Sequence, residues 1–501
     1  MSQDLVAQAL TALRSKNYTL ARDCIADFAQ NNPLDVQHYL IRGLSDIALE
    51  DWVAAEQTFA DAAQDFPHQA QLWFNLGVAQ ENLGHLEDAS ASYEHSLDLD
   101  PNQGAACGNL ANIYRRLGIL HGAEDMARRA IALNTPQGAA FNSLGLALNR
   151  QGKFTEAGEA FREAARLEPH NPHAQLNLAN LAVDQLDFAK AWPLFAAARA
   201  GSNDPALRHE ESMARLLSGD YAAGWPLYEA RLERPGALRV TPLCPRWNGE
   251  PLGGKKLLLV AEQGFGDVLM FCRYGYVLLS HGVELVWSVP ASLQRLLASN
   301  LPGLVLPETE PLPAADYYAP LMSLPLALGK TLPIDAPPAP YLSAPEEPKL
   351  PQPAKDMRPI GLVWTGSPTH QRDHERSILL EQFAPLFGKV KAQFYAPFTG
   401  AGLEQITPQT PVIKLTKLIT DFADTAALLK QLEVLVTVDT AAAHLAGALG
   451  VKTCLLLPHC PDWRWGTSGT MTPWYPNMTL LRQPAYGDWE SVMEQLAEKL
   501  A

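Results

Sequence analysis

The sequence predicts an α-solenoid, an array of stacked helical hairpins, followed by an α/β region built on parallel sheets. Three observations support this fold class. Small residues recur every 34 positions through the first half of the 501-residue chain. In the second half, apolar runs alternate with helix-like intervals, as they do where helices join parallel strands. A proline-rich stretch, residues 311–353, separates two patterns of this kind.

The 34-residue period is carried by alanine, aromatic, proline and glycine positions. Alanine lets two antiparallel helices approach closely, an aromatic residue four positions later shares its helix face, and proline ends a helix. The alanine register is Ala21, Ala55, Ala89, Ala123, Ala157 and Ala191, and the register four positions later is Ile25, Phe59, Tyr93, Ala127, Phe161 and Phe195. The proline register is Pro33, Pro67, Pro101 and Pro169, with Pro136 displaced by one, and the glycine register is Gly43, Gly77 and Gly145, with Ala111 and Ala179 replacing glycine.

This period and these residue types resemble the tetratricopeptide repeat over about residues 1–235, with a slipped seventh unit at Gly219–Arg231. Such arrays offer a concave face to extended peptides or other proteins. We therefore expect the repeats to recruit a protein acceptor, with a scaffold for oligomerisation as the alternative. Four asparagines near one helix face are candidate acceptor-binding residues, although hydrogen bonds between helices would also explain them: Asn75, Asn109, Asn142 and Asn177.

Composition limits the classes of partner and the compartment. A net charge of −15 argues against broad binding to nucleic acid or to an anionic membrane. The chain starts without a secretory signal pattern and contains no window of 18 apolar residues. Its six scattered cysteines form no CxxC pair and indicate no disulfide framework. We expect a cytoplasmic protein without a membrane segment, with a homo-oligomer possible.

The second half predicts two Rossmann-like lobes facing one cleft, at residues 236–350 and 351–501. Predicted strands of the first lobe are 257–262, 283–288 and 303–306, and the proline-rich stretch is expected to be irregular, ending as a linker. Predicted strands of the second lobe begin at 359 and continue at 392–395, 411–415, 433–439 and 453–457. Because open α/β sheets bind ligands at the carboxyl ends of strands, the chemistry is expected just after residues 262, 364 and 438.

The first strand end reads AEQGFGDVLMFCRYG, residues 261–275. Gly264 and Gly266 permit a tight turn from strand to helix, and Asp267 lies at the start of that helix. Asp267 is either a helix cap or a general base that reaches into the cleft. The glycine pattern alone is a weak dinucleotide fingerprint.

The second strand end reads GLVWTGSPTHQRDHERSI, residues 361–378. It places Ser367, Arg372 and Arg376 in a cationic loop where a phosphate group would arrive, and arginine binds phosphate oxygens in a bidentate manner. A solvated surface loop is the alternative. Its histidines lack the carboxylate and histidine spacing of a metal site. We therefore expect no metal and no cofactor, and the phosphate-bearing ligand is expected to be a substrate.

The third strand end reads VLVTVDTAAAHLAGALG, residues 434–450. Thr440 is predicted to cap the helix that follows, whose free N–H groups favour a phosphate anion. Ala441 and its neighbours let that phosphate approach the backbone, and His444 shares the helix face of Thr440, from which it could reach a phosphate or a ribose. Tight packing of a small-residue helix on a sheet would explain the same residues.

The segment VDTAAAHLAGALG resembles the D-T-G/A-x-x-H signature of the heptosyltransferase-like glycosyltransferases of family 9. GFGDVLM resembles the amino-terminal G-D-x-L motif of that family. The tail, including PDWRW and TPWYPNMTLLRQP, is similar to bacterial proteins that join tetratricopeptide repeats to such a catalytic half, some implicated in glycosylating flagellin. The architecture also resembles the eukaryotic protein O-GlcNAc transferase.

The resemblance implies a GT-B fold and an inverting, metal-independent transfer of sugar from a nucleotide-sugar donor to Ser or Thr of a flagellin-like protein. It implies that Asp267 is the base, that Asp439, Thr440 and Ala441 contact the donor phosphate, and that His444 is the motif histidine. Ala441 replaces the usual glycine. A lysine of the heptosyltransferases has no match, and Arg372 or Arg376 is its candidate substitute.

Two other functions fit the same sequence. A non-enzymatic repeat adaptor would carry a degenerate transferase half, and a glycan-directed transferase would build lipopolysaccharide. The first is disfavoured because Asp267, His444 and the basic loop are all present, and the second because a long repeat array has no obvious use there. Trp463 and Trp465 of PDWRW are expected to pack within their domain rather than to form a wall for a sugar.

Overall fold

The computed structural model describes residues 2–133, 137–234, 236–370 and 372–501. The chain forms two compact units, Met1–Leu181 and Ala182–Ala501. Pro136 of the proline register and the predicted domain boundary at residue 235 lie outside the described residues. Within those residues, no helix combines the length and the apolar character needed to cross a bilayer.

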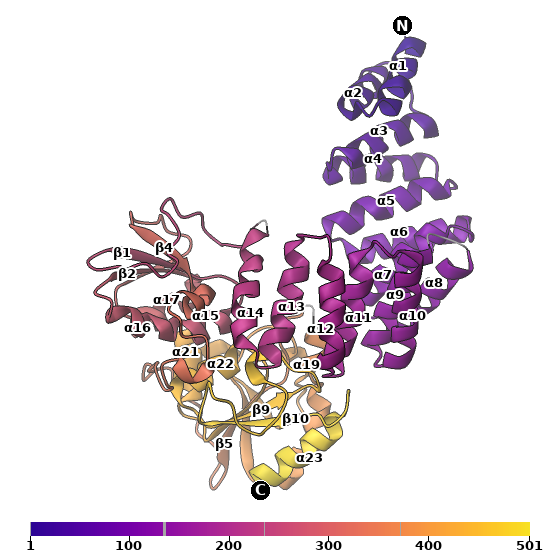
Figure 1. The fold of residues 1–501 in the computed structure, drawn as a ribbon. Coiled ribbons are helices and arrows are strands. Elements are labelled where there is room, and N and C mark those ends of the chain that lie inside the picture. Colours follow the sequence, from indigo (N-terminus) through magenta and orange to yellow (C-terminus); the bar gives the residue numbers. More distant parts are fainter. Residues whose placement is uncertain (1, 134–136, 235, 371) are drawn as a thin grey trace. The chain divides into compact units, whose positions relative to one another are not determined.

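The first unit consists of antiparallel helices that pack against their sequence neighbours (Figure 1). Asparagine or aspartate side chains cap several of them, as at Asn17 and Asp51. The helices are α1 (Ser2–Arg14), α2 (Tyr18–Ala29), α3 (Val36–Ala48), α4 (Trp52–Asp65), α5 (Ala70–Leu83), α6 (Leu86–Leu99), α7 (Gly104–Arg116), α8 (Leu120–Ala132), α9 (Gln137–Arg150), α10 (Phe154–Leu167) and α11 (Pro172–Asp184), the last of which extends into the second unit.

In three of the hairpins, the glycine register lies against the aromatic register. A Cβ atom added to Gly77 of α5 would lie 2.8 Å from the Tyr93 ring of α6. Gly43 meets Phe59 in the same way, and Gly145 meets Phe161. The alanine register is fully buried beside them. The period therefore predicts the helix contacts correctly, and at these glycines the aromatic ring of the next helix leaves no room for a side chain.

The second unit begins with more helices. These are α12 (Phe188–Arg199), α13 (Pro205–Leu217), α14 (Tyr221–Tyr228) and the short η1 (Glu229–Glu233). The predicted slipped repeat at Gly219–Arg231 corresponds to α14 and the start of η1. Asp220 caps α14 by accepting from the Ala223 amide. The last hairpin, α13 with α14, packs against the α/β part of this unit.

The first sheet has four parallel strands in the order β3-β2-β1-β4. Its strands are β1 (Lys256–Val260), β2 (Glu284–Val289), β3 (Leu304–Pro307) and β4 (Tyr317–Pro320), and its helices are α15 (Phe265–Phe271), η2 (Cys272–Tyr274), α16 (Gly275–Leu279), α17 (Ala291–Ala298), η3 (Leu321–Ser323), α18 (Leu324–Ala327) and η4 (Pro333–Asp335). The expectation that 311–353 is irregular throughout is wrong, because β4 and three short helices lie in it. Proline is tolerated in β4 because Pro320 is the last residue of an edge strand.

The second sheet has six parallel strands in the order β10-β9-β8-β5-β6-β7. Its strands are β5 (Arg358–Val363), β6 (Ala392–Ala396), β7 (Val412–Lys414), β8 (Val434–Val438), β9 (Thr453–Leu457) and β10 (Met478–Arg482). Its helices are α19 (Asp373–Arg376), η5 (Leu380–Phe383), α20 (Ala384–Lys389), η6 (Leu403–Gln405), η7 (Thr416–Leu418), α21 (Phe422–Leu429), α22 (Ala441–Leu449), η8 (Trp463–Trp465) and α23 (Trp489–Leu500). The parallel pairing is confirmed, and β10 is an addition that the sequence did not predict.

Both sheets reverse their strand order once. In the first sheet the chain leaves β1 on one side and returns at β4 on the other, and in the second sheet it does the same at β5 and β8. Crevices for ligands form outside the carboxyl ends of strands at such switch points. The loops after β1 and β4, and after β5 and β8, are therefore the places to examine for a site.

Candidate functional site

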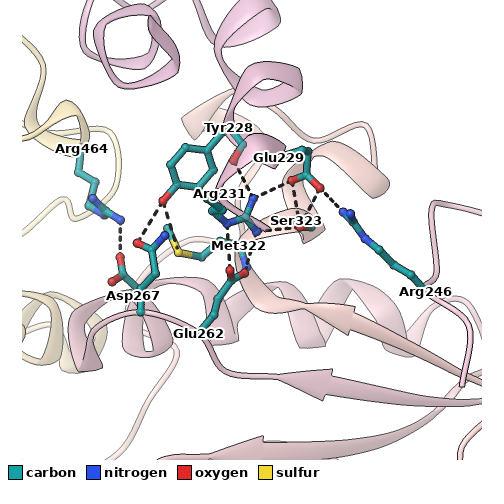
Figure 2. A network of polar contacts seen from close by, with 10 residues as sticks. Tyr228, Glu229, Arg231, Arg246, Glu262, Asp267, Met322, Ser323 and Arg464 are labelled. Atoms are coloured by element: carbon teal, nitrogen blue, oxygen red, sulfur yellow. Dashed lines mark hydrogen bonds and ion pairs between the residues drawn. The ribbon is translucent and has the colours of Figure 1, made fainter. Parts of the chain in front are cut away.

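A buried ion pair lies where β1 ends. The Arg231 guanidinium donates from Nε to Glu262 Oε2 at 2.9 Å and from Nη2 to Oε1 at 2.7 Å (Figure 2). Arg231 is 4% exposed and Glu262 is 1% exposed. Burial opposes the charge on Arg231, but the carboxylates of Glu262 and Glu229 raise its pKa. The pair joins η1, at the end of the last helical hairpin, to the loop that leads into α15.

Further groups complete this network. Arg231 also donates to Glu229 Oε1 at 2.9 Å and to Ser323 Oγ at 2.8 Å, and Glu229 pairs with Arg246. The Met322 amide donates to Glu262 Oε1 at 3.2 Å. Because residues 321–323 follow β4, the network ties together both strand ends at the first switch point. Sequence reasoning missed it, although a glutamate directly after an apolar strand was the signal available.

Asp267 lies in the first turn of α15, two residues after the first helical position. One of its carboxylate oxygens, Oδ2, accepts from the Gly264 amide at 2.9 Å. The other, Oδ1, pairs with Arg464 of η8, which comes from the second sheet's side of the unit (Figure 2). The side chain of Asp267 remains 16% exposed. Gly264 is therefore the N-cap residue, and Asp267 caps the helix from its third position and already has a cationic partner.

At the second switch point, Arg376 spans the loops after β5 and β8. Its Nη1 donates to the Asp439 carbonyl oxygen at 2.8 Å, and its Nε lies 3.0 Å from Asp373 Oδ1. A Cβ atom on Gly366 would lie 2.5 Å from Arg376 Nη2. Glycine at that position thus makes room for the guanidinium. Arg376 lies where the sequence predicted a phosphate contact.

The N-terminus of α22 differs from the prediction in one respect. Thr440 is its N-cap by position, but its side chain accepts no hydrogen bond from the helix, and Oγ1 lies 3.3 Å from Thr437 Oγ1 instead. The predicted cap is therefore wrong. Among the described residues, no acceptor bonds the amides of Ala441 and Ala442. Two N–H groups at the positive end of this nine-residue helix remain available to an anion.

His444 lies in the contact between α15 and α22. A Cβ atom on Gly266 would lie 2.7 Å from His444 Cδ2. The ring is 5% exposed, stacks on Trp465 with centroids 5.1 Å apart, and has Nδ1 3.0 Å from the Tyr475 hydroxyl. Burial, with the charge of Arg464, lowers the pKa of His444 to about 3. The imidazole is a neutral packing group here, so contact with a phosphate or ribose would require α15 and α22 to separate.

Between the ends of β1 and β8, carboxylates lie on both sides of the Arg464 guanidinium. Arg464 Nη1 donates to Asp462 Oδ1 at 2.8 Å, in addition to its pair with Asp267. Burial and the Asp462 carboxylate raise the pKa of Asp439 to about 6. Burial also acts to raise the pKa of Asp462, but Arg464 outweighs burial and lowers it. The predicted cleft is thus bridged at this point by side chains.

The two tryptophans of PDWRW are buried, as predicted. Trp463 packs edge to face on Trp225 of α14, with centroids 5.4 Å apart, and Trp465 lies on His444. They hold η8 against both α14 and α22. Their packing fixes the backbone that carries Arg464 between them.

Two other predicted residues, Ser367 and Arg372, make contacts of their own. Ser367 Oγ lies 2.8 Å from Thr369 Oγ1 in an exposed loop. Arg372 pairs with Glu375 at 2.6 Å and with Asp184 at 3.1 Å, so its guanidinium is already committed to carboxylates. Of the two candidate substitutes for the missing lysine, Arg376 lies at the switch point.

The four predicted asparagines make contacts within the repeat array. Asn177 Nδ2 donates to Asn142 Oδ1 at 2.5 Å, Asn109 Nδ2 to the Tyr93 hydroxyl at 3.1 Å, and Asn75 Nδ2 to the Gln71 carbonyl at 2.8 Å. Two of these bonds join different helices, which is the alternative that the sequence left open. Within the described residues, no group of three His, Cys, Asp or Glu side chains is arranged to hold a metal ion.

Comparison with known proteins confirms the repeats. Models described as tetratricopeptide repeat match residues 6–69, 70–103, 109–172 and 143–205. Among curated proteins, the chain is 25% identical over 397 residues to Protein FlbA of Caulobacter vibrioides, covering 68% of this chain and 63% of FlbA. The chain therefore spans less than two thirds of the length of that relative.

Two solved structures are similar to part of the chain. A tetratricopeptide repeat protein from Parabacteroides merdae is 14% identical, with a TM-score of 0.43, over 47% of this chain and 93% of that one. MamA from Desulfovibrio magneticus is 19% identical, with a TM-score of 0.31, over 33% of this chain and 93% of that one.

Proposed function

We propose that the protein is an inverting glycosyltransferase that moves a sugar from a nucleotide-sugar donor to Ser or Thr of a protein held by the repeats. One observation carries the proposal. The loop with Asp267 and the start of α22 come from different sheets, yet Gly266 lies directly against His444. This contact brings the loop of Asp267 and the first turns of α22, which carry the two groups that the proposed reaction needs, to one junction.

In the proposed reaction, the Asp267 carboxylate takes the proton of the acceptor hydroxyl. The resulting oxygen attacks the anomeric carbon of the sugar, and the bond from that carbon to the donor phosphate oxygen breaks. Negative charge then grows on the departing phosphate. The free amides of Ala441 and Ala442 and the guanidinium of Arg376 stabilise that charge, and fixed donors of this kind each contribute a few kcal/mol. The configuration at the anomeric carbon is inverted because displacement occurs once.

The repeats supply the acceptor in this proposal. Solenoid repeats expose a continuous concave surface suited to an extended segment of another protein. A flagellin-like protein is the acceptor class implied by the family resemblance.

The decisive experiment incubates the full chain with UDP-, ADP- and CMP-linked sugars and a purified flagellin, and reads the intact mass of the flagellin. We expect the acceptor to gain the mass of one or more sugars, and Asp267→Asn to abolish that gain. Arg358→Gln, which removes a charge at the amino end of β5, is the matched control and should retain activity. An unchanged mass with every donor would contradict the proposal.

A non-enzymatic adaptor is the second candidate, and the pairing of Asp267 with Arg464 favours it. In this pair Oδ1 of Asp267 is occupied by the guanidinium, so it is not free to take a proton from an acceptor. If glycosylation of the host's flagellin is unchanged in cells that carry Asp267→Asn, the adaptor replaces the enzyme as the proposed function.

A further inference from the structure

Arg464 is a buried cation held between two carboxylates. It is 8% exposed, and its guanidinium carbon lies 4.4 Å from the centre of the Trp463 ring. Nη1 donates to Asp462, which lies on the same loop. Nη2 donates to Asp267 of α15, across the junction between the two sheets (Figure 2). Packing of η8 on α14 and α22 fixes the start of the side chain, so its reach is limited to this junction.

The guanidinium is not saturated by these two partners. Arginine carries five N–H donors in a rigid fork. Among the described residues, the buried Nε of Arg464 has no hydrogen-bond acceptor. An unpaired buried donor is costly. A further acceptor, such as a phosphate oxygen, would satisfy it.

Arg464 also lies beside the start of α22. The next residue, Trp465, stacks on His444 of that helix with ring centroids 5.1 Å apart, and the charge of Arg464 acts on His444 and on Asp439, two residues before Ala441. A phosphate at the free amides of that helix would therefore be attracted by the charge of Arg464. Its oxygens would compete with the Asp267 carboxylate for the same guanidinium N–H groups. Arginine bonds phosphate oxygens in a bidentate manner, with charge-assisted strength.

We propose that Arg464 is a positioning residue that moves from Asp267 to the donor phosphate, so that donor binding releases the Asp267 carboxylate. This inference rests on the proposed function and says which residue controls the availability of the proposed base, Asp267. With Arg464 in place, Oδ1 of Asp267 accepts from the guanidinium and is not free to take a proton from an acceptor hydroxyl. Once the phosphate oxygens bind the guanidinium, Asp267 loses its cationic partner. Its carboxylate can then take the proton of the acceptor hydroxyl. The base is then activated only when the donor is present.

The test measures binding of UDP, ADP, CMP and inorganic pyrophosphate to the full chain by isothermal titration calorimetry. Asp267→Asn removes the competing charge, so at least one of these probes should bind about five-fold or more tightly than to the wild type. Arg464→Gln should weaken the same probe about ten-fold, and Arg464→Lys should restore part of that loss because it returns the charge. In the Arg464→Gln background, Asp267→Asn should no longer improve binding.

The dependence of the Asp267→Asn effect on Arg464 distinguishes the proposed exchange, in which Arg464 moves from Asp267 to the phosphate, from a merely structural role. A structural role would weaken binding in every variant. Arg358→Gln is the control for removing an arginine, and thermal unfolding checks each variant for folding. If Asp267→Asn binds every probe no more tightly than the wild type does, the exchange is overturned. Coupled binding without sugar transfer to any acceptor would overturn only the proposed function, and absence of binding to both wild type and Asp267→Asn would overturn both.

Discussion

At the scale of single residues, Glu262 and Arg231 show how a charge pair is maintained away from water. Two hydrogen bonds join them, and neighbouring groups occupy the remaining donors of Arg231. Such a pair adds little over an apolar substitute but is costly to break, because the remaining charge stays buried without its partner. We expect Glu262→Gln to reduce the free energy of unfolding by about 3 kcal/mol.

Urea unfolding of the second unit's transition checks this value. The double variant Glu262→Leu with Arg231→Met should recover more than half of the loss, because it removes both charges. The more exposed pair Arg208 and Glu233 provides the control, where Glu233→Gln should change stability far less than Glu262→Gln does. Equal losses at the buried and exposed pairs would contradict the argument.

His444 makes stability depend on pH. Its pKa is lowered to about 3 from an ordinary value of 6.5. Above pH 6.5 the imidazole is neutral whether the chain is folded or unfolded. Between pH 6.5 and 3 only the unfolded chain takes up the proton, so the free energy of unfolding falls as the pH falls. The slope from one such group is at most about 1.4 kcal/mol per pH unit.

We therefore expect His444→Gln to lose less stability on acidification than the wild type, by about 1 kcal/mol per pH unit between pH 6 and 4. Urea unfolding at several pH values measures both slopes. Asp439, whose pKa is raised, acts in the opposite direction in this window, but it is present in both proteins. Parallel stability curves for the two proteins would show that His444 is not held neutral.

Sequence reasoning identifies residues whose role follows from local position, and it misses those defined by a distant partner. Asp267 and Arg376 were predicted because each follows a strand. Arg464 was quoted only as part of a tryptophan cluster, since its partner Asp267 is 197 positions away. Thr440 shows the converse error, because a residue type suited to capping bonds another threonine instead.

At the scale of elements, the contact between α15 and α22 depends on the absence of one side chain. A methyl group at Gly266 would overlap the ring of His444, which cannot move because Trp465 and Tyr475 enclose it. Added volume in a packed contact costs about 1–3 kcal/mol. We expect Gly266→Ala to destabilise the second unit by this amount and to weaken nucleotide binding.

Gly253→Ala is the matched control, since a Cβ atom there meets no neighbour within 4 Å. It should leave the melting temperature of the second unit unchanged within about 1 °C, whereas Gly266→Ala should lower it by several degrees. Differential scanning calorimetry measures both. A Gly266→Ala protein as stable as the control would mean that the two helices separate readily.

Most elements could be predicted from apolar runs, but two strands could not. β4 is Tyr317–Pro320, in a stretch whose prolines suggested irregular structure, and it forms because β1 offers a free edge. β10 is Met478–Arg482, a short segment after a loop rich in glycine and aromatic residues, which pairs with β9. Both are edge strands, so their formation depends on a neighbour rather than on their own pattern.

At the scale of the whole molecule, the chain consists of two compact units with separate cores. Phe59 lies in the core of the first unit, and Leu362 lies in the core of the second. Because each unit has a core of its own, we expect the units to unfold in separate transitions. Phe59→Ala should cost about 3–5 kcal/mol and lower only the transition of the first unit.

Leu362→Ala is the reciprocal variant and should lower only the transition of the second unit, by about 2–5 kcal/mol. Calorimetry of the full chain resolves the two transitions, and the tryptophans of the second unit's junction report on it by fluorescence. A single transition that shifts equally in both variants would mean that the units unfold together.

The pairing of Gly43 with Phe59, and of Gly77 with Tyr93, has a consequence for anyone who rebuilds this array. The two positions of each pair are sixteen residues apart and depend on each other: the glycine leaves a space, and the aromatic ring fills it. A repeat transplanted from another protein will therefore pack correctly only when both helices of its hairpin are transferred. A library that varies only one of the two positions will consist mostly of variants that do not pack.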